Sequence, residues 1–303
     1  MKTLYIAPLL LALCIGEAFA STPINLSRDV RPNAHIRIDN TRGEVTVTAW
    51  DRNQIQVSGS LGEGARPLQL EGDDRNVDIR VQGGDDKGKW FSWGNDSNMG
   101  STTLNVRVPK GVDVEVKVVS APVSIDGLEG GRIDVESVSG RVRANVRTPS
   151  ASMQTVSGSI DLAGRADKAD LQTVSGDITA PNVTERVDAQ TVSGHMIVGG
   201  GPWKEANFST VSGDTDINGG PAGNGAKLTV DAMSGDVKLQ LPSSISARLE
   251  ASTFSGDIGS DWGQPSRGED GPGKELKTTI GDGSARIHVE SFSGDLRIRK
   301  AGR

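Results

Sequence analysis

The chain has 303 residues, a formal net charge of −6, 24% charged residues and one cysteine. Its acidic and basic residues are interspersed, which excludes the basic stripe of a nucleic-acid surface and the polybasic patch that binds anionic membranes. With 39 glycines and 13 prolines, and no apolar pattern at helical spacing over three turns beyond the first residues, the composition indicates strands and turns.

Residues 1–20 have the pattern of a secretory signal peptide. Met1 and Lys2 precede an apolar run from Leu4 to Ile15, and Ala18-Phe19-Ala20 supplies small residues before an expected cleavage at Ser21. No second apolar run of about 18 residues follows, so we expect no transmembrane segment after cleavage. The pattern predicts an exported protein, in the periplasm or outside the cell, at its surface or free.

Cys14, the one cysteine, lies inside this leader. A lipoprotein signal would need a small residue before the cysteine, where Leu13 stands. We therefore expect a mature chain without thiols or disulfides, stabilised by backbone ladders and packing.

Residues 21–119 predict an irregular β region. Apolar residues alternate on both sides of Gly43 within 36–47, so a first coil could begin there, and 77–81 and 104–108 read as further strands. We expect this region to close one end of the repeats that follow, because an open terminal coil would leave an edge prone to aggregation.

Residues 120–303 repeat one phrase eight times: an apolar residue, Ser-Gly, a mostly polar residue and usually another apolar one. The glycines advance by 18, 18, 18, 19, 22, 21 and 38 residues, so the last gap reads as two periods with an insertion. The copies are Val138–Val142, Val156–Ile160, Val174–Ile178, Val192–Met196, Val211–Thr215, Met233–Val237, Phe254–Ile258 and Phe292–Leu296.

A fixed period of this length, with alternating apolar residues between the phrases, predicts an all-β fold: a parallel β-solenoid (β-helix) with about 18–22 residues per coil and short strands of about four to six residues. A β-propeller or sandwich is the alternative architecture, but blades repeat at about 40 residues or more. Within the phrase we expect the glycine to form a corner, the serine to bond the turn, and the apolar residue before it to fill the corner of the core. The expected structural turns are Ser157, Gly158, Ser175, Gly176, Ser193, Gly194, Ser212, Gly213, Ser234, Gly235, Ser255, Gly256, Ser293 and Gly294.

The sequence resembles the bacterial putative-adhesin family catalogued as domain of unknown function 4097. The resemblance is carried by Ile38–Val45, Leu104–Pro109, the Ser-Gly-Asp series, and Gly281–Gly283 with Ile287–Val289. It implies an exported β-helical protein and brings no catalytic residue with it. Long members of the family often have a membrane anchor or cytoplasmic segment, which we do not find here.

Aspartates follow five of the glycines, at 177, 214, 236, 257 and 295. Stacked carboxylates could share calcium, but capping of turn amides is the simpler interpretation. Arg141, Ser159 and His195 interrupt the series, and the calcium-binding nonapeptide of β-rolls is absent. We therefore expect no metal and no cofactor.

The sequence predicts no enzyme. Three histidines stand far apart, without a His-x-x-x-His pair or a Gly-x-Ser-x-Gly elbow. The 18-residue period also occurs in hexapeptide acyltransferases, but the aliphatic residues that they need every six positions fail at Lys168 and Arg186. A β-helical polysaccharide lyase or hydrolase remains the alternative function, because acidic residues alone do not exclude it.

Two glycine-rich insertions carry aromatic residues. Trp90, Phe91 and Trp93 lie in 83–102, and Trp262 lies in 259–274. Such residues are either contacts for a ligand or partner or lids on the core. We predict a binding, adhesin-like or scaffold protein of the cell envelope, whose partner is an unidentified envelope protein or glycan.

Overall fold

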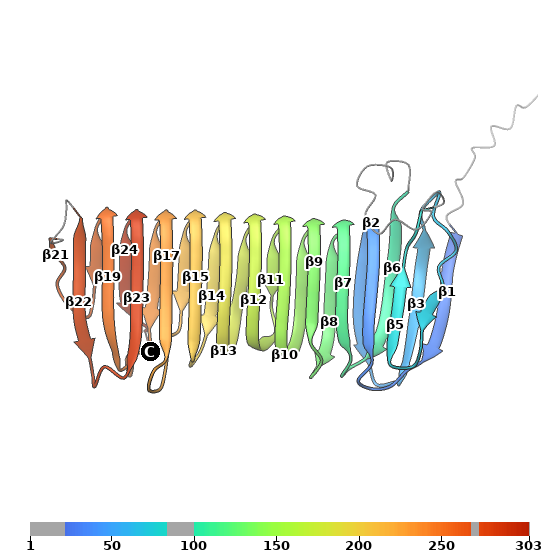
Figure 1. The fold of residues 1–303 in the computed structure, drawn as a ribbon, viewed down its shortest axis with the longest axis horizontal. Helices are drawn as coiled ribbons and strands as arrows, with labels where there is room; N and C mark the ends of the chain where they lie inside the picture. The colour runs from blue at the N-terminus through green and yellow to red at the C-terminus, as the bar shows by residue number, and fades with distance from the viewer. Residues whose placement is uncertain (1–21, 84–99, 268–272, 303) are drawn as a thin grey trace, which may run out of the picture.

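The computed structural model describes residues 22–83, 100–267 and 273–302. Within these ranges every strand belongs to one sheet of 24 strands and no helix occurs, which confirms the all-β class (Figure 1). The strands are β1 (Thr22–Asp29), β2 (His35–Trp50), β3 (Gln54–Leu61), β4 (Leu70–Gly72), β5 (Asn76–Arg80), β6 (Thr102–Pro109), β7 (Asp113–Ser120), β8 (Val123–Glu129), β9 (Ile133–Ser139), β10 (Val142–Ser157), β11 (Ile160–Leu162), β12 (Arg165–Ser175), β13 (Ile178–Ser193), β14 (Met196–Gly200), β15 (Glu205–Ser212), β16 (Thr215–Asn218), β17 (Lys227–Ser234), β18 (Val237–Leu241), β19 (Ala247–Ser255), β20 (Ile258–Ser260), β21 (Ser266–Arg267), β22 (Lys274–Ile280), β23 (Ala285–Ser293) and β24 (Leu296–Lys300).

Most of the sheet is parallel, with a register that follows the sequence repeat. Val142 of β10 pairs with Ile160 of β11, and Arg147 pairs with Arg165 of β12, both at an offset of 18 residues. We call one full turn of the chain around the core, with one strand segment on each side, a coil. The strands vary in length more than we expected. β10 and β13 each run for 16 residues, because the backbone stays extended around the bend opposite Ser-Gly.

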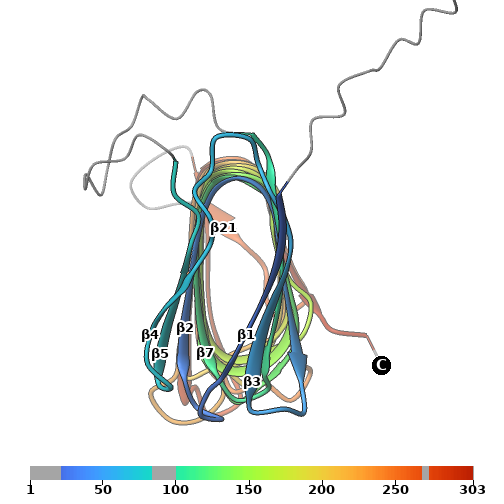
Figure 2. The ribbon, with the colours of Figure 1, turned by 90° about the vertical axis from the view of Figure 1, so that its right-hand side faces the viewer.

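Each coil has two sides that enclose the core, as the view along the long axis shows (Figure 2). One side holds β7, β9, β12, β15, β17, β23 and β19, and the other holds β8, β11, β14, β16, β18, β24 and β20. Alternate residues face inward, so β12 buries Ala169 and Leu171, and β15 buries Ala206 and Phe208. Each rung adds apolar side chains to one continuous core.

At the carboxyl end the spatial order differs from the chain order. β23 pairs in parallel with both β17 and β19, so the last coil of the sequence lies between two earlier ones. β19 then pairs antiparallel with β22 at the end of the stack. The 38-residue gap is therefore a reversal through β20, β21 and β22, and the expectation of two periods with an insertion was wrong.

The amino end has a similar arrangement. β2 runs along both sides of the coil, bending at Gly43, and lies between β5 and β7 on one side and between β6 and β8 on the other. Gly43 has a φ of +124°, and a Cβ there would lie 1.9 Å from the Thr102 carbonyl oxygen. The first coil thus begins in β2, and the boundary expected between 119 and 120 falls inside β7 of the same sheet.

Candidate interaction surface

The apolar residue before each Ser-Gly pair points outward. In β12 the side chains of Leu171 and Thr173 are buried, whereas Val174 is 48% exposed and Ser175 is exposed. The expectation that this residue fills the corner of the core was wrong. The inward position belongs to the residue just before it, because the strand keeps its alternation up to the bend.

These eight residues and Val119, which holds the equivalent position before Ser120 in β7, form a continuous row along one edge of the molecule, which we call the apolar ridge. The strands that carry it end side by side, with their arrowheads nearly in line in Figure 1. Eight of its nine members are 43–59% exposed, and Val138 is half-buried. In spatial order the ridge consists of Val119, Val138, Val156, Val174, Val192, Val211, Met233, Phe292 and Phe254.

A row of small polar residues takes the corner of the core instead. Thr155, Thr173, Thr191, Thr210 and Thr253 are each at most 5% exposed. The hydroxyls of Thr173, Thr191 and Thr253 donate to glycine carbonyls of neighbouring bends at 3.2–3.5 Å, whereas those of Thr155 and Thr210 are buried without a partner. The recurrence of threonine in phase with the buried apolar residues was the signal in the sequence that could have revealed this.

Uncharged side chains flank the ridge over its four central coils. On the bend side lie the exposed serines 157, 175, 193 and 212, and on the strand side lie Gln154, Gln172, Gln190 and Ser209. The Gln172 side-chain amide donates to Asp170 at 2.9 Å, and that of Gln190 donates to Asp188 at 2.8 Å. These contacts hold the glutamines in place on their own strands.

The aspartates after the glycines cap backbone amides of neighbouring coils. Asp177 accepts from the His195 amide at 2.9 Å, and Asp214 accepts from the Asp236 amide at 3.0 Å. Asp236 accepts from the Asp295 amide at 3.0 Å, and Asp295 accepts from the Asp257 amide at 3.0 Å. Capping is thus confirmed for these four residues, although the amide lies one coil away. Within the described ranges no group of three or more metal-ligating side chains occurs.

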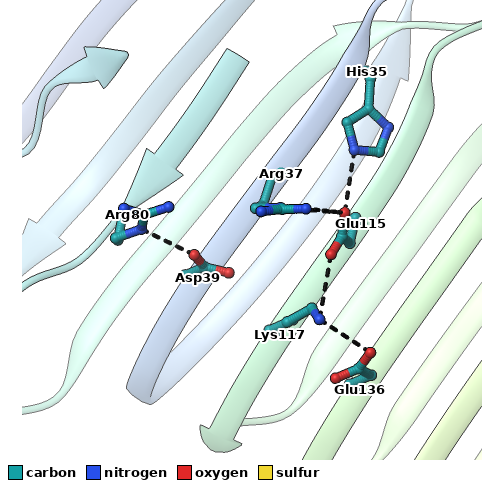
Figure 3. Close-up of polar contacts among 7 residues, drawn as sticks. All are labelled: His35, Arg37, Asp39, Arg80, Glu115, Lys117 and Glu136. Atoms are coloured by element: carbon teal, nitrogen blue, oxygen red, sulfur yellow. Dashed lines mark hydrogen bonds and ion pairs between the residues drawn. The ribbon is translucent and has the colours of Figure 1, made fainter. Parts of the chain in front are cut away.

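A charged cluster lies on the outer face of the first coils, on β2, β7 and β9 (Figure 3). Glu115 is its centre: one carboxylate oxygen accepts from His35 at 3.1 Å and from Arg37 at 3.0 Å, and the other lies 3.4 Å from the Lys117 ammonium. Lys117 also contacts Glu136 at 3.1 Å. The cluster joins three adjacent strands by their side chains.

The carboxyls of Glu115 and Asp39 have shifted pKa values. Burial acts to raise the pKa of Glu115, but Arg37, His35 and Lys117 outweigh it and lower that pKa below its ordinary value. Burial raises the pKa of Asp39, against the opposing effect of Arg80 at 3.1 Å. Because both oxygens of Glu115 are engaged by cations, its chemistry here is that of an ion-pair anchor.

A shallow depression of about 150 Å³ lies on the opposite side, lined by Glu44, Pro122, Val123, Ser124, Arg141 and Arg143. Pockets for small ligands usually measure about 300–1,000 Å³. The depression is therefore a poor site for a small molecule, and the apolar ridge is the stronger candidate surface.

The aromatic residues expected as contacts divide into two groups. Trp90, Phe91 and Trp93 lie outside the described residues. Trp262 is half-buried and packs against the core, with the Lys300 ammonium 4.4 Å from its ring centre and its carbonyl accepting from Thr278 at 3.3 Å. Trp262 therefore covers part of the core at the last coils.

A comparison with solved structures finds several that align with this chain over most of the length of both chains. A "putative adhesin" from Parabacteroides merdae is 13% identical, with a TM-score of 0.41, over 91% of this chain and 96% of that one. A "putative lipid binding protein" from Parabacteroides distasonis is 14% identical, with a TM-score of 0.39, over 93% and 95%. A "putative cell adhesion protein" from Clostridium sporogenes is 13% identical, with a TM-score of 0.27, over 92% and 100%.

Among curated proteins, none matches this chain. No helix in the described ranges is long and apolar enough to cross a membrane. The family model described as Toastrack DUF4097 matches residues 33–299, which confirms the resemblance expected from the sequence. The match includes both the first coils and every Ser-Gly phrase, and the chain therefore belongs to the Toastrack DUF4097 family.

Proposed function

We propose that the protein is an exported, non-enzymatic β-solenoid that acts in the cell envelope as a binding, adhesin-like or scaffold protein. The observation that carries the proposal is the apolar ridge. Its nine side chains lie in one uninterrupted row on the outside of the sheet. Soluble monomers rarely expose a contiguous apolar patch of more than a few hundred Å², and larger ones mark interaction sites.

The rigidity of the underlying sheet supports a scaffold role. Every ridge residue stands on a strand whose neighbours are hydrogen-bonded on both sides, so its position along the row is set by the ladder. A partner therefore meets a preformed surface and little ordering entropy is lost on binding. Export rests on the leader pattern in residues 1–20, and an unidentified envelope protein or glycan is the proposed partner.

The test measures association with isolated envelope fractions of the source bacterium by cosedimentation. A double variant, Met233→Ser with Phe292→Ser, removes two of the largest exposed side chains of the ridge without touching the core. We expect it to lose most of the association, whereas Ile197→Ser, 44% exposed on β14 of the other side, should retain it. Equal association of both variants and the wild type would overturn the ridge as the functional surface.

The enzyme alternative is checked in parallel. Purified protein is incubated with envelope polysaccharides, and new reducing ends or unsaturated products are measured. We expect none above the background of a heat-denatured sample. Release of products that follows the protein through purification would overturn the non-enzymatic assignment in favour of a polysaccharide lyase or hydrolase.

A further inference from the structure

We propose that the apolar ridge is the contact surface for a second copy of this chain, packed antiparallel about a two-fold axis near Val192. This inference rests on the proposed function, because it identifies the envelope protein that the ridge binds as a second copy of this chain. A two-fold contact requires a surface that complements itself, with the same patch contributed by both copies. Four properties of the ridge meet that requirement.

The first is its area. Eight side chains, each about half exposed, present on the order of 700 Å² of surface, and the flanking serines and glutamines add more. Stable protein–protein contacts bury about 800 Å² on each partner. The ridge with its flanks is thus large enough for a dimer.

The second is the absence of charge at the centre. Val156, Val174, Val192 and Val211 are flanked only by serine and glutamine side chains, which form the strip nearest the proposed axis. Charged residues occupy the strand-side row in the coils on either side of these four, as Lys117, Glu136, Asp231 and Glu290. Burying these four valines and their immediate flanks against a copy of the chain therefore places no charged side chain at the axis, and Asp170 and Asp188 lie beyond the glutamines that bond them.

The third is the order of side-chain sizes. Valines occupy the amino-terminal part of the ridge, and Met233, Phe292 and Phe254 occupy the carboxyl-terminal part. In an antiparallel pair, valines of one copy lie opposite the larger side chains of the other. A parallel pair would place phenylalanines against phenylalanines and leave gaps between opposed valines.

The fourth is the spacing of the rungs. Adjacent strands lie about 4.8 Å apart, so two ridges of the same kind remain in register over all nine rungs. The apolar stripe of an α-helix advances about 5.4 Å per turn and would drift by about one rung over this length. The spacing favours a second copy over a helical partner.

The first experiment measures the oligomeric state. Full-length protein is exported from a bacterial host, its processed mass is checked, and sedimentation velocity is recorded over a range of micromolar concentrations. We expect a monomer–dimer equilibrium. Val192→Asp brings two carboxylates together at the axis and should weaken the dimer at least tenfold, whereas the matched variant Ile197→Asp should leave it unchanged. A wild-type protein that stays monomeric throughout would overturn the proposal.

The second experiment tests the register with single cysteines, since Cys14 in the leader is the only native one. A short bismaleimide should link Val192→Cys to itself. It should link Val174→Cys efficiently to Val211→Cys in a mixture, and either of them poorly to itself. Efficient self-linkage at all three positions would indicate a parallel pair and overturn the antiparallel arrangement.

The two proposals fail in different ways. If the protein is monomeric but loses envelope association in the Met233→Ser, Phe292→Ser variant, the second copy is excluded and the proposed function stands. If Val192→Asp dissociates the dimer and envelope association persists, the dimer stands and the ridge is not the surface that binds the envelope.

Discussion

The phenyl rings of Phe254 and Phe292 stack with their centres 5.0 Å apart and their planes 5° from parallel, although 38 residues separate them in the chain. Both are more than half exposed. The two rings meet because the chain reverses at the carboxyl end, where β23 pairs directly with β19. It also shows how the repeat places equivalent residues one rung apart and on the outside.

The outward direction of the ridge can be tested within one strand. Leu171 is buried and Val174 is 48% exposed, three residues later in β12. Leu171→Ala should lower the free energy of unfolding by about 2–5 kcal/mol, as truncations in cores do. Val174→Ala should change it by no more than about 0.5 kcal/mol, the usual range for surface sites. Chemical denaturation measures both, and equal losses would place Val174 in the core.

Replacing Gly176 by Ala tests the close approach of successive coils. Its φ is +153°, and a Cβ would lie 2.0 Å from the Gly158 carbonyl oxygen, so the backbone must shift. We expect a loss of about 2–4 kcal/mol in unfolding free energy from strain and overpacking. Gly259→Ala is the control, since its nearest atom is the end of the Arg299 side chain at 3.6 Å. Unchanged thermal midpoints for both variants would contradict the expectation.

The Glu115 cluster predicts a pH dependence. Because the folded-state pKa of Glu115 lies below its ordinary value of 4.5, its stabilising contribution is complete above about pH 4.5 and is lost as pH falls through the folded pKa. Glu115→Gln should cost about 1–2 kcal/mol at pH 7 and reduce the slope of stability against pH in that acidic window. Glu136→Gln, which removes a carboxylate that contacts Lys117, is the control and should have a smaller effect.

Asp39 should act in the opposite direction. Burial raises its pKa above 3.8, so protonation of the folded state recovers some stability as pH falls through the folded pKa, and this recovery is complete below about pH 3.8. Asp39→Asn should therefore make the acid-induced loss of stability steeper than in the wild type. A shallower acid transition in this variant would contradict the assigned direction.

Calcium should have little effect on stability. Four of the repeat aspartates already accept amide hydrogen bonds from the next coil, and Asp177 is an example. We expect the melting temperature to be the same in millimolar calcium and in EDTA. Asp177→Ala should cost about 1 kcal/mol in either condition, the usual value of a lost hydrogen bond. A rise with calcium that EDTA reverses would indicate a metal site instead.

The period and the strand alternation were enough to predict the all-β class and the parallel sheet. Residues such as Ile160 and Leu162 lie where the alternation put them, and Gly43 begins the first coil as its flanking strands indicated. The inward and outward directions at the bend do not follow from hydrophobicity alone, because the valine before each Ser-Gly pair is apolar and yet points outward. Thr155 and its equivalents, which are polar yet buried, hold the inward position.

The ends of the stack could not be predicted from the sequence. A phrase such as Phe292–Leu296 is the same whether its coil lies at the end or between two others, since nothing in it specifies a neighbour. The choice depends on β22, an antiparallel strand with no Ser-Gly phrase, which occupies the position beyond β19. The order of the coils in the stack depends on which strand edges the connecting segments can reach.

The placement of β23 and β24 has a consequence for synthesis and truncation. These strands pair with β17 and β18 on one side and with β19 and β20 on the other, so residues synthesised after all the other strands complete an interior rung. Until they emerge, two unpaired edges face each other across a gap. A chain cut after Ile280 would lose the connection between β19 and the rest of the stack, not merely a terminal rung. β23 and β24 therefore determine whether the whole ladder closes.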